Sequence, residues 1–156
     1  MRIHSLPESK RYPDDDCERA EIVRRHLEIA QALLAGQELC ILFLTWFGPV
    51  HGSHPESISG FEVAKLTHLA DLSIFEDDDE VHFFATPFPW NEEEIKKLVL
   101  ATADGLIGPI LFANMESGTA YAPYDGGADL FFPSHLQADI ARKRWASWLS
   151  ERPDGL

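Results

Sequence analysis

The residues whose types and spacing could do chemistry lie near the C-terminus, in the segment YAPYDGGADLFFP, residues 121–133. Asp125 and Asp129 stand on either side of a Gly-Gly pair, directly after Tyr124. Two carboxylates held close together can bind a metal ion or share a proton. Aspartate and glycine also dominate tight turns for backbone reasons alone. A structural interpretation is therefore favoured, in which both glycines adopt positive φ and Asp129 caps a turn or pairs with an arginine of the last helix.

A second set of chemical groups is the histidine pair of HGSH, His51 and His54. Two imidazoles three residues apart can chelate zinc or nickel, but a closed site needs further ligands, and no cysteine lies nearby. The chain also lacks the motifs G-x-S-x-G, H-E-x-x-H and the Lys-Ser/Thr of a phosphate-binding loop. We therefore expect no catalytic residue, no metal and no cofactor.

Aromatic side chains offer a different function, which is contact with a partner. Phe88 and Trp90 lie in the irregular segment TPFPW, which follows an expected strand. Exposed aromatic residues in such a segment are typical of a binding surface. The acidic run Glu76–Glu80 is expected to be an exposed turn that could add charge to that surface.

Helical spacing of apolar residues predicts a first helix at 16–35, with Gly36 as its C-cap. The clearest boundary is at Asn91, an N-cap followed by Glu94 in a capping-box arrangement, which predicts a helix at about 92–103. Ser134 can cap a third helix. The apolar face expected for that helix consists of Leu136, Ile140, Trp145, Trp148 and Leu149.

Strands are expected between these helices. The apolar run ELCILFLTWFG reads as a strand buried on both faces, and VHFFATPFPW reads as another. Phe61, Ala64, Leu66, Leu69 and Leu72 could line a short helix, and a strand around residues 72–75 is an open alternative. Asp-Gly-Gly after TAYAPY predicts a hairpin. This order indicates an α+β fold, with one mostly antiparallel sheet of about five strands packed with three main helices. We expect one domain over 1–156, in which 1–13 is an extended arm.

The segment PYDGGADLFF, followed by a helix that ends in RWASWLSERPDGL, resembles the C-terminal part of an uncharacterised bacterial domain family. Members of that family end in a Tyr-Asp-x-x-x-Asp hairpin and an aromatic-bearing helix, and the first helix and the ELCILFLTWF strand fit the same layout. The resemblance implies a bacterial origin and a fold. It implies no particular activity.

Charge is the strongest global property, since 26 acidic against 13 basic residues give a net charge of −13. A field of this sign repels nucleic acid and anionic lipid, so neither is expected as a partner, whereas a basic protein would be attracted. No apolar window is long enough for a transmembrane helix, and the N-terminus does not read as a secretory signal. A cytoplasmic location is the expectation.

Two functional hypotheses remain open. The first is a protein-interaction module of the immunity or antitoxin type that binds a basic partner near Phe88, Trp90 and the hairpin turn. The second is a small-molecule-binding domain or minor enzyme with a pocket around Tyr124, Asp125 and Asp129. A homodimer formed through the C-terminal tryptophan helix is compatible with either hypothesis.

Overall fold

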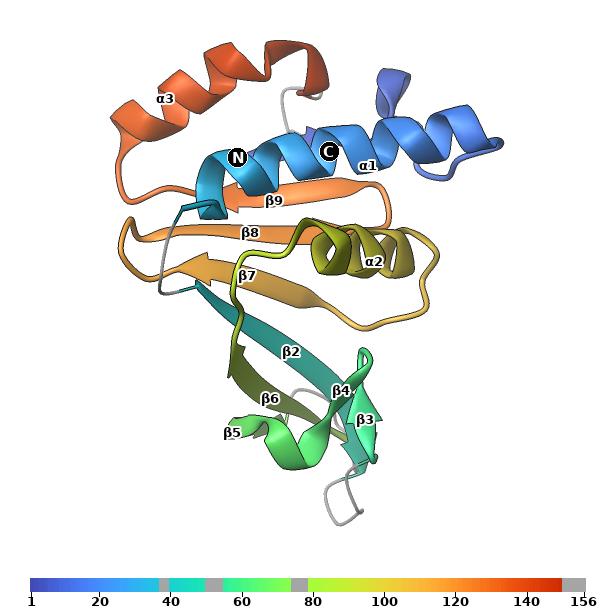
Figure 1. Cartoon of the computed structure of the whole chain (residues 1–156), viewed down its shortest axis with the longest axis vertical. Helices are drawn as coiled ribbons and strands as arrows, with labels where there is room; N and C mark the ends of the chain where they lie inside the picture. Colours follow the sequence, from blue (N-terminus) through green and yellow to red (C-terminus); the bar gives the residue numbers. More distant parts are fainter. Residues whose placement is uncertain (37–39, 50–54, 74–78, 150–156) are drawn as a thin grey trace.

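The computed structural model describes residues 1–36, 40–49, 55–73 and 79–149. His51, His54 and most of the expected acidic turn at Glu76–Glu80 lie outside these described residues. Within them the protein is an α+β fold with three α-helices and a main sheet of seven antiparallel strands (Figure 1).

The main sheet has the strand order β1-β9-β8-β7-β2-β6-β5, and every pairing in it is antiparallel. Its strands are β1 (Arg2–His4), β2 (Cys40–Pro49), β5 (Thr67–Ser73), β6 (Asp79–Pro87), β7 (Ile110–Asn114), β8 (Thr119–Tyr124) and β9 (Gly127–Phe131). A small separate ribbon pairs β3 (Ser57–Ile58) with β4 (Phe61–Glu62), and the 3₁₀ turn η2 (Val63–Lys65) links it to β5.

Side-chain caps begin all three α-helices, α1 (Asp16–Leu34), α2 (Glu92–Ala103) and α3 (His135–Arg144). Asp15, Asn91 and Ser134 each accept a hydrogen bond from the backbone N–H three residues on, which satisfies one of the amides left open at a helix start. The predicted bounds of the first two helices and the start of the third are therefore confirmed to within a residue or two, whereas the third helix ends at Arg144, before the Trp145, Trp148 and Leu149 expected on it. Among the described helices, none combines the length and the apolar composition that crossing a membrane requires.

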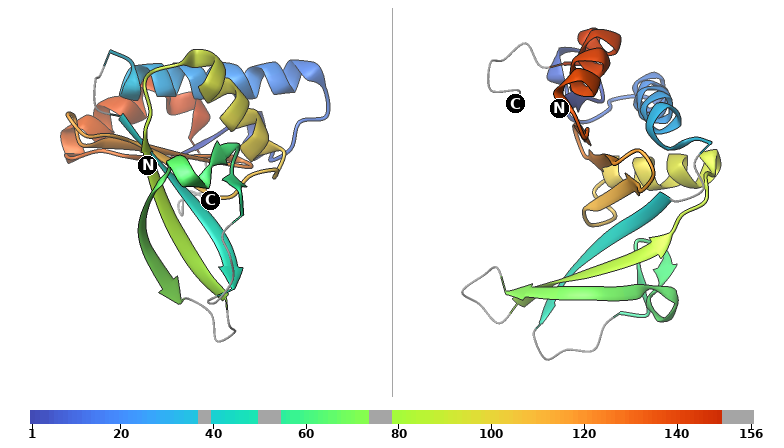
Figure 2. Two further views of the ribbon diagram at one scale, coloured as in Figure 1. Left: turned by 60° about the horizontal axis from the view of Figure 1, so that its bottom comes forward. Right: turned by 90° about the vertical axis from the view of Figure 1, so that its left-hand side faces the viewer.

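The core lies between the sheet and the helices. In the right-hand view of Figure 2, α1 and α2 lie on the same side of β7, β8 and β9, and α3 lies beyond β9 next to α1. One face of these strands therefore packs against helices, and its largest fully buried side chains include Tyr121, Phe112 and Leu130. The other half of the sheet, β2, β6 and β5, extends away from α1 and α3 (Figure 1).

The sheet has seven strands instead of the expected five or so, for two reasons. The N-terminal arm contributes β1, because Ile3 and Leu6 are buried and the backbone of residues 2–4 pairs with β9. The ambiguous segment after Phe61 forms the two-residue strand β4, a 3₁₀ turn and then β5, and its helical alternative is wrong.

The expected apolar face of the third helix is wrong in part. Leu136 is 71% exposed and Ile140 is 60% exposed, whereas Ala141, Trp145 and Trp148 are buried. Trp145 belongs to the next turn, where its indole Nε1 donates a hydrogen bond to Glu28 of α1 at 3.0 Å. The tryptophans therefore fasten α3 to α1, and a dimer formed through them would require them to leave the core.

Candidate functional site

The predicted hairpin is confirmed, because Tyr124 pairs with Gly127 and only Asp125 and Gly126 lie between β8 and β9. The expected positive φ at the two glycines is wrong, since neither has a left-handed backbone. Gly127 is needed for a different reason. A Cβ atom there would lie 2.0 Å from the carbonyl oxygen of Ile3, so a side chain would collide with the backbone of β1.

Both aspartates of the hairpin form ion pairs with arginines of the N-terminal segment. Arg2 contacts Asp129 through Nε and Nη2, both at 2.9 Å, and Arg11 contacts Asp125 through Nε at 2.9 Å and Nη2 at 3.0 Å. Such two-pronged contacts match the planar guanidinium to the carboxylate. The expected arginine partner from the last helix is therefore wrong, and both carboxylates bind the N-terminal segment to the hairpin.

A small pocket of about 190 Å³ lies beside this hairpin, and Tyr124 and Asp125 line it together with Arg2, His4, Ser9, Arg11 and Gly126. Asp129 is not among its lining residues, so the two aspartates do not converge on one cavity. Burial, opposed in part by Arg2, raises the pKa of the Tyr124 phenol, which keeps the hydroxyl protonated. The pocket is smaller than the roughly 300–1,000 Å³ typical of small-molecule sites.

Phe88 and Trp90 do not form the exposed aromatic pair that the sequence suggested. Phe88 is only 6% exposed, and its ring meets Phe112 edge-on at 5.1 Å between centroids. Its backbone N–H also donates to the carbonyl of Cys40 at 2.8 Å, which holds the segment against β2. Trp90 is partly buried against the same core. The expected exposure of Phe88 is therefore wrong, because the prolines on either side do not lead the segment away from the core.

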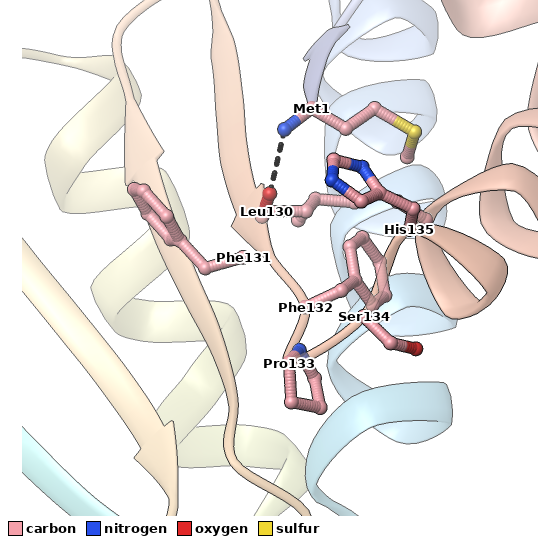
Figure 3. A pocket seen from close by; sticks show the side chains of 8 residues that line it. Met1, Leu130, Phe131, Phe132, Pro133, Ser134 and His135 are labelled. Carbon is pink, nitrogen blue, oxygen red and sulfur yellow. Dashed lines mark hydrogen bonds between the residues drawn. The ribbon is translucent and has the colours of Figure 1, made fainter.

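A second pocket, of about 320 Å³, lies where the N-terminus meets the start of α3 (Figure 3). The Met1 amino group donates to the carbonyl of Leu130 at 2.7 Å, and Phe132 and His135 lie on the same side. Burial lowers the pKa of this amino group. Phe131 points away from that pocket, toward the opposite face of the sheet, and is half exposed.

The face of the sheet opposite the helices is apolar from Phe131 of β9 to Leu72 of β5 and carries no described helix, while the Asp129–Arg2 ion pair lies on the same face beside Ala122. Its side chains alternate with the buried ones along each strand, as the pleat requires. One row of neighbours runs across four strands through Phe131, Ala120, Ala113 and Ile41. The next rows contain Leu111 beside Phe43, then Thr45 beside Phe83, then Phe47 and Leu72 on either side of Val81. Antiparallel sheets that face water on one side normally place polar residues there.

The middle of this face is hollowed into a pocket of about 420 Å³, which is larger than the other two. It is lined by Phe43, Thr45, Phe83, Pro109, Ile110, Leu111 and Ala122. Phe47, Leu72 and Phe131 toward the ends of the face are each about half exposed. We call this surface the open sheet face. The apolar run of β2 predicted a strand buried on both faces, so the sequence did not indicate this open surface.

A buried polar chain lies inside the core, where Ser5, His26 and Tyr121 meet. Ser5 Oγ and His26 Nε2 are 2.7 Å apart, and His26 Nδ1 and Tyr121 Oη are 2.5 Å apart. Burial, assisted by the nearby Arg25 charge, lowers the pKa of His26 to about 3, and burial raises the pKa of Tyr121 well above its usual range. The group is enclosed and neutral, so its role is structural: it joins the arm, α1 and β8.

A helix-covered antiparallel sheet with one apolar face left open defines a small α+β protein with a surface suited to binding. The chain belongs to the family described as a domain of unknown function, DUF3885, whose model matches residues 1–153. This confirms the resemblance to an uncharacterised domain family. No curated protein and no solved structure matches the chain.

Proposed function

We propose that this chain is a cytoplasmic protein-interaction module that binds a basic protein, in the manner of immunity and antitoxin proteins, and that the open sheet face is its contact surface. The observation that carries the proposal is the run of apolar side chains on that face from Phe131 of β9 through β8, β7, β2 and β6 to Leu72 of β5, bordered at Ala122 by the Asp129–Arg2 ion pair. Contiguous exposed apolar surface on a small protein is typical of a binding site. Phe43 and Phe83 supply the aromatic side chains that dominate interface energetics.

Charge supports a basic partner over a second copy of the chain. Among the residues that the structure describes, nine of the twelve lysines and arginines form ion pairs with carboxylates, namely Arg2, Lys10, Arg11, Arg19, Arg24, Arg25, Lys65, Lys97 and Arg144. The net charge of −13 is the excess of 26 acidic over 13 basic residues, and most of the described basic residues are already paired within the chain. Two such copies repel each other, whereas a basic partner gains in association rate from the same field.

The small-molecule alternative has less support. Its expected pocket around Asp125 and Asp129 is small, and arginines neutralise both carboxylates. An enzyme that uses paired carboxylates needs them free to bind an ion or exchange a proton. The interaction hypothesis needs only the open sheet face, which has no charged residue at its hollow.

Ala122→Gln tests the proposal, because Ala122 lies in the hollow of the open sheet face and the substitution adds bulk without charge. Leu136→Gln is the matched control, since Leu136 is an exposed apolar residue on α3. Each immobilised protein is used to capture partners from a lysate of the source cells. The captured protein is then purified, and its Kd is measured at rising salt concentration.

We expect the captured protein to be basic. Its Kd should rise at least about tenfold for Ala122→Gln, which corresponds to about 1.4 kcal/mol of binding free energy, and should stay unchanged for Leu136→Gln. Its affinity should also fall with salt, because charge attraction is screened. Equal affinities for wild type and Ala122→Gln would contradict the proposal. A wild-type dimer that Ala122→Gln dissociates, measured by light scattering, would assign the open sheet face to a second copy instead.

A further inference from the structure

Three side chains able to ligate a metal ion gather on β5 and β6, far along the sheet from the hairpin. They are His68 and Asp71 of β5 and His82 of β6, and their ligating atoms all lie within 4.8 Å of one another. Asp71 and His82 are direct partners across the two strands. His68 pairs with Phe84, two residues beyond His82 on β6, so both histidines belong to the same face of the sheet.

A β-bulge brings His68 and Asp71 together. In a regular strand, residues three apart point to opposite faces, because side chains alternate with a period of two. The register of β5 against β6 shifts between His68 and Ala70, which makes Leu69 an extra residue in the strand. Because of the bulge, His68 and Asp71 lie on the same face although they are three positions apart. In a regular strand, residues on the same face are two or four positions apart. Leu69 itself is half exposed.

Both histidines contact the carboxylate of Asp71. Its Oδ1 lies 2.7 Å from His68 Nε2 and 2.6 Å from His82 Nδ1. A tetrahedral zinc ion, with bonds of about 2.0–2.2 Å, separates its ligand atoms by about 3.3 Å. The two contacts of Asp71 are shorter than that spacing and the three ligating atoms lie within 4.8 Å of one another, so side-chain rotation of Asp71 and of the partly exposed His68 is needed to surround an ion.

The surroundings hold one ligand firmly and leave the cluster open to solvent. The His82 side chain is only 5% exposed, and its ring stacks on Trp46 of β2 at 4.8 Å between centroids. Asp71 and His68 are 39% and 43% exposed, so an ion can enter from the solvent. Ligands on paired strands with a stacked aromatic neighbour are well positioned before any ion arrives, which lowers the cost of binding.

We propose that His68 Nε2, Asp71 and His82 Nδ1 form a binding site for a divalent transition-metal ion such as Zn²⁺, with water completing the coordination. Two imidazoles and one carboxylate are ligands that zinc and its neighbours accept in proteins. Three protein ligands leave at least one position on the ion free for water or a small anion. The site is separate from the open sheet face, because its three side chains alternate with Val81, Phe83 and Leu72 on the opposite side of the strands.

The test is a titration of the untagged full chain with Zn²⁺ by isothermal calorimetry, together with Co²⁺, whose visible spectrum reports coordination number and ligand type. Asp71→Asn and His68→Gln are suitable variants, since both residues are partly exposed. The control is the double variant His51→Gln/His54→Gln, which removes the other histidine pair of the chain. His135→Gln on α3 controls for a solitary exposed histidine.

We expect binding of one ion per chain, with affinity reduced at least about tenfold by Asp71→Asn and by His68→Gln, since even outer-shell changes cost about 10–100-fold. Both controls should bind as the wild type does. Circular dichroism and a urea midpoint confirm that each variant is folded. The proposal is overturned if the wild type binds neither ion, or if binding survives both variants and disappears in His51→Gln/His54→Gln.

Discussion

Acidification from pH 7 to pH 4.5 is expected to lower the free energy of unfolding of the wild type by roughly 2–3 kcal/mol more than that of His26→Gln. His26 is enclosed in the core, where its two ring nitrogens contact Ser5 and Tyr121. Burial, with a smaller contribution from the Arg25 charge, lowers its pKa from 6.5 to about 3. At pH 4.5 the folded protein therefore keeps this imidazole neutral.

The sign follows from proton binding in the two states. Below pH 6.5 the unfolded chain protonates His26, whereas the folded chain does not do so until about pH 3. The unfolded state thus binds more protons in this window, and stability falls as pH falls. The contribution of His26 is fully present above pH 6.5 and is lost progressively down to about pH 3. Contacts with Arg24 and Arg25 lower the pKa of Glu21 to about 2. Glu21 therefore adds a further loss of unfolding free energy only below pH 4.5.

Urea unfolding at pH 7, 6, 5.5, 5 and 4.5 measures this effect. The slope of the free energy of unfolding against pH is compared between the wild type and His26→Gln. His26→Gln is the appropriate control, because an amide can donate to one neighbour and accept from the other without titrating. It is expected to be less stable than the wild type at pH 7 and to have the flatter pH profile. Parallel profiles for the two proteins would show that His26 is accessible to protons in the folded state.

The helices were predictable because their start signals are local. Asp15, Asn91 and Ser134 each cap the helix that follows, and the hydrogen bond involved spans only three residues of the sequence. The hairpin at Asp125 was predictable for the same reason, since a turn of two residues depends on its own sequence. The α+β class then followed from the order of these local elements.

Contacts between distant segments could not be predicted in this way. The pairing of Arg2 with Asp129 joins segments near opposite ends of the chain, and the sequence predicted an arginine of the last helix as the partner instead. The bulge at Leu69 depends on how β5 meets β6, so the convergence of His68 and Asp71 had no visible signal in spacing alone. The turn glycines were recognised, but the crowding that requires Gly127 comes from β1.

The open sheet face could not be recognised from apolar content, because a strand with both faces apolar is typical of a strand covered on both sides. In β2, Leu42 and Leu44 are fully buried in the core, while Phe43 between them lines the hollow on the other side of the sheet. A partner seated on that hollow would give β2 the two-sided burial that its sequence indicates. The disagreement between the sequence pattern and the isolated chain is therefore itself an argument for a partner.

Gly127→Ala is expected to lower the free energy of unfolding by about 3 kcal/mol, near the upper end of the range for overpacked sites. The added Cβ would lie 2.0 Å from the carbonyl oxygen of Ile3 and 2.8 Å from the Tyr124 hydroxyl, and the first of these atoms belongs to the backbone of β1. Relief requires β1 to move off β9. Ile3 and Leu6, both buried, would then lose part of their packing.

Gly126→Ala, one residue away in the same turn, is the control. It shows whether the turn tolerates any side chain in place of glycine, apart from the collision with β1. Its Cβ would lie 3.1 Å from Cγ of Arg11, an exposed and flexible side chain that can move aside, so a change within about 1 kcal/mol is expected. Urea midpoints compare the two variants. Hydrogen exchange at Leu130, whose N–H donates to the Met1 carbonyl at 2.7 Å, reports whether β1 has detached. Glycine is required at position 127 because β1 approaches it closely, so we expect faster exchange at Leu130 in Gly127→Ala and not in Gly126→Ala. An equal loss of unfolding free energy in both variants would instead show that the turn itself requires glycine.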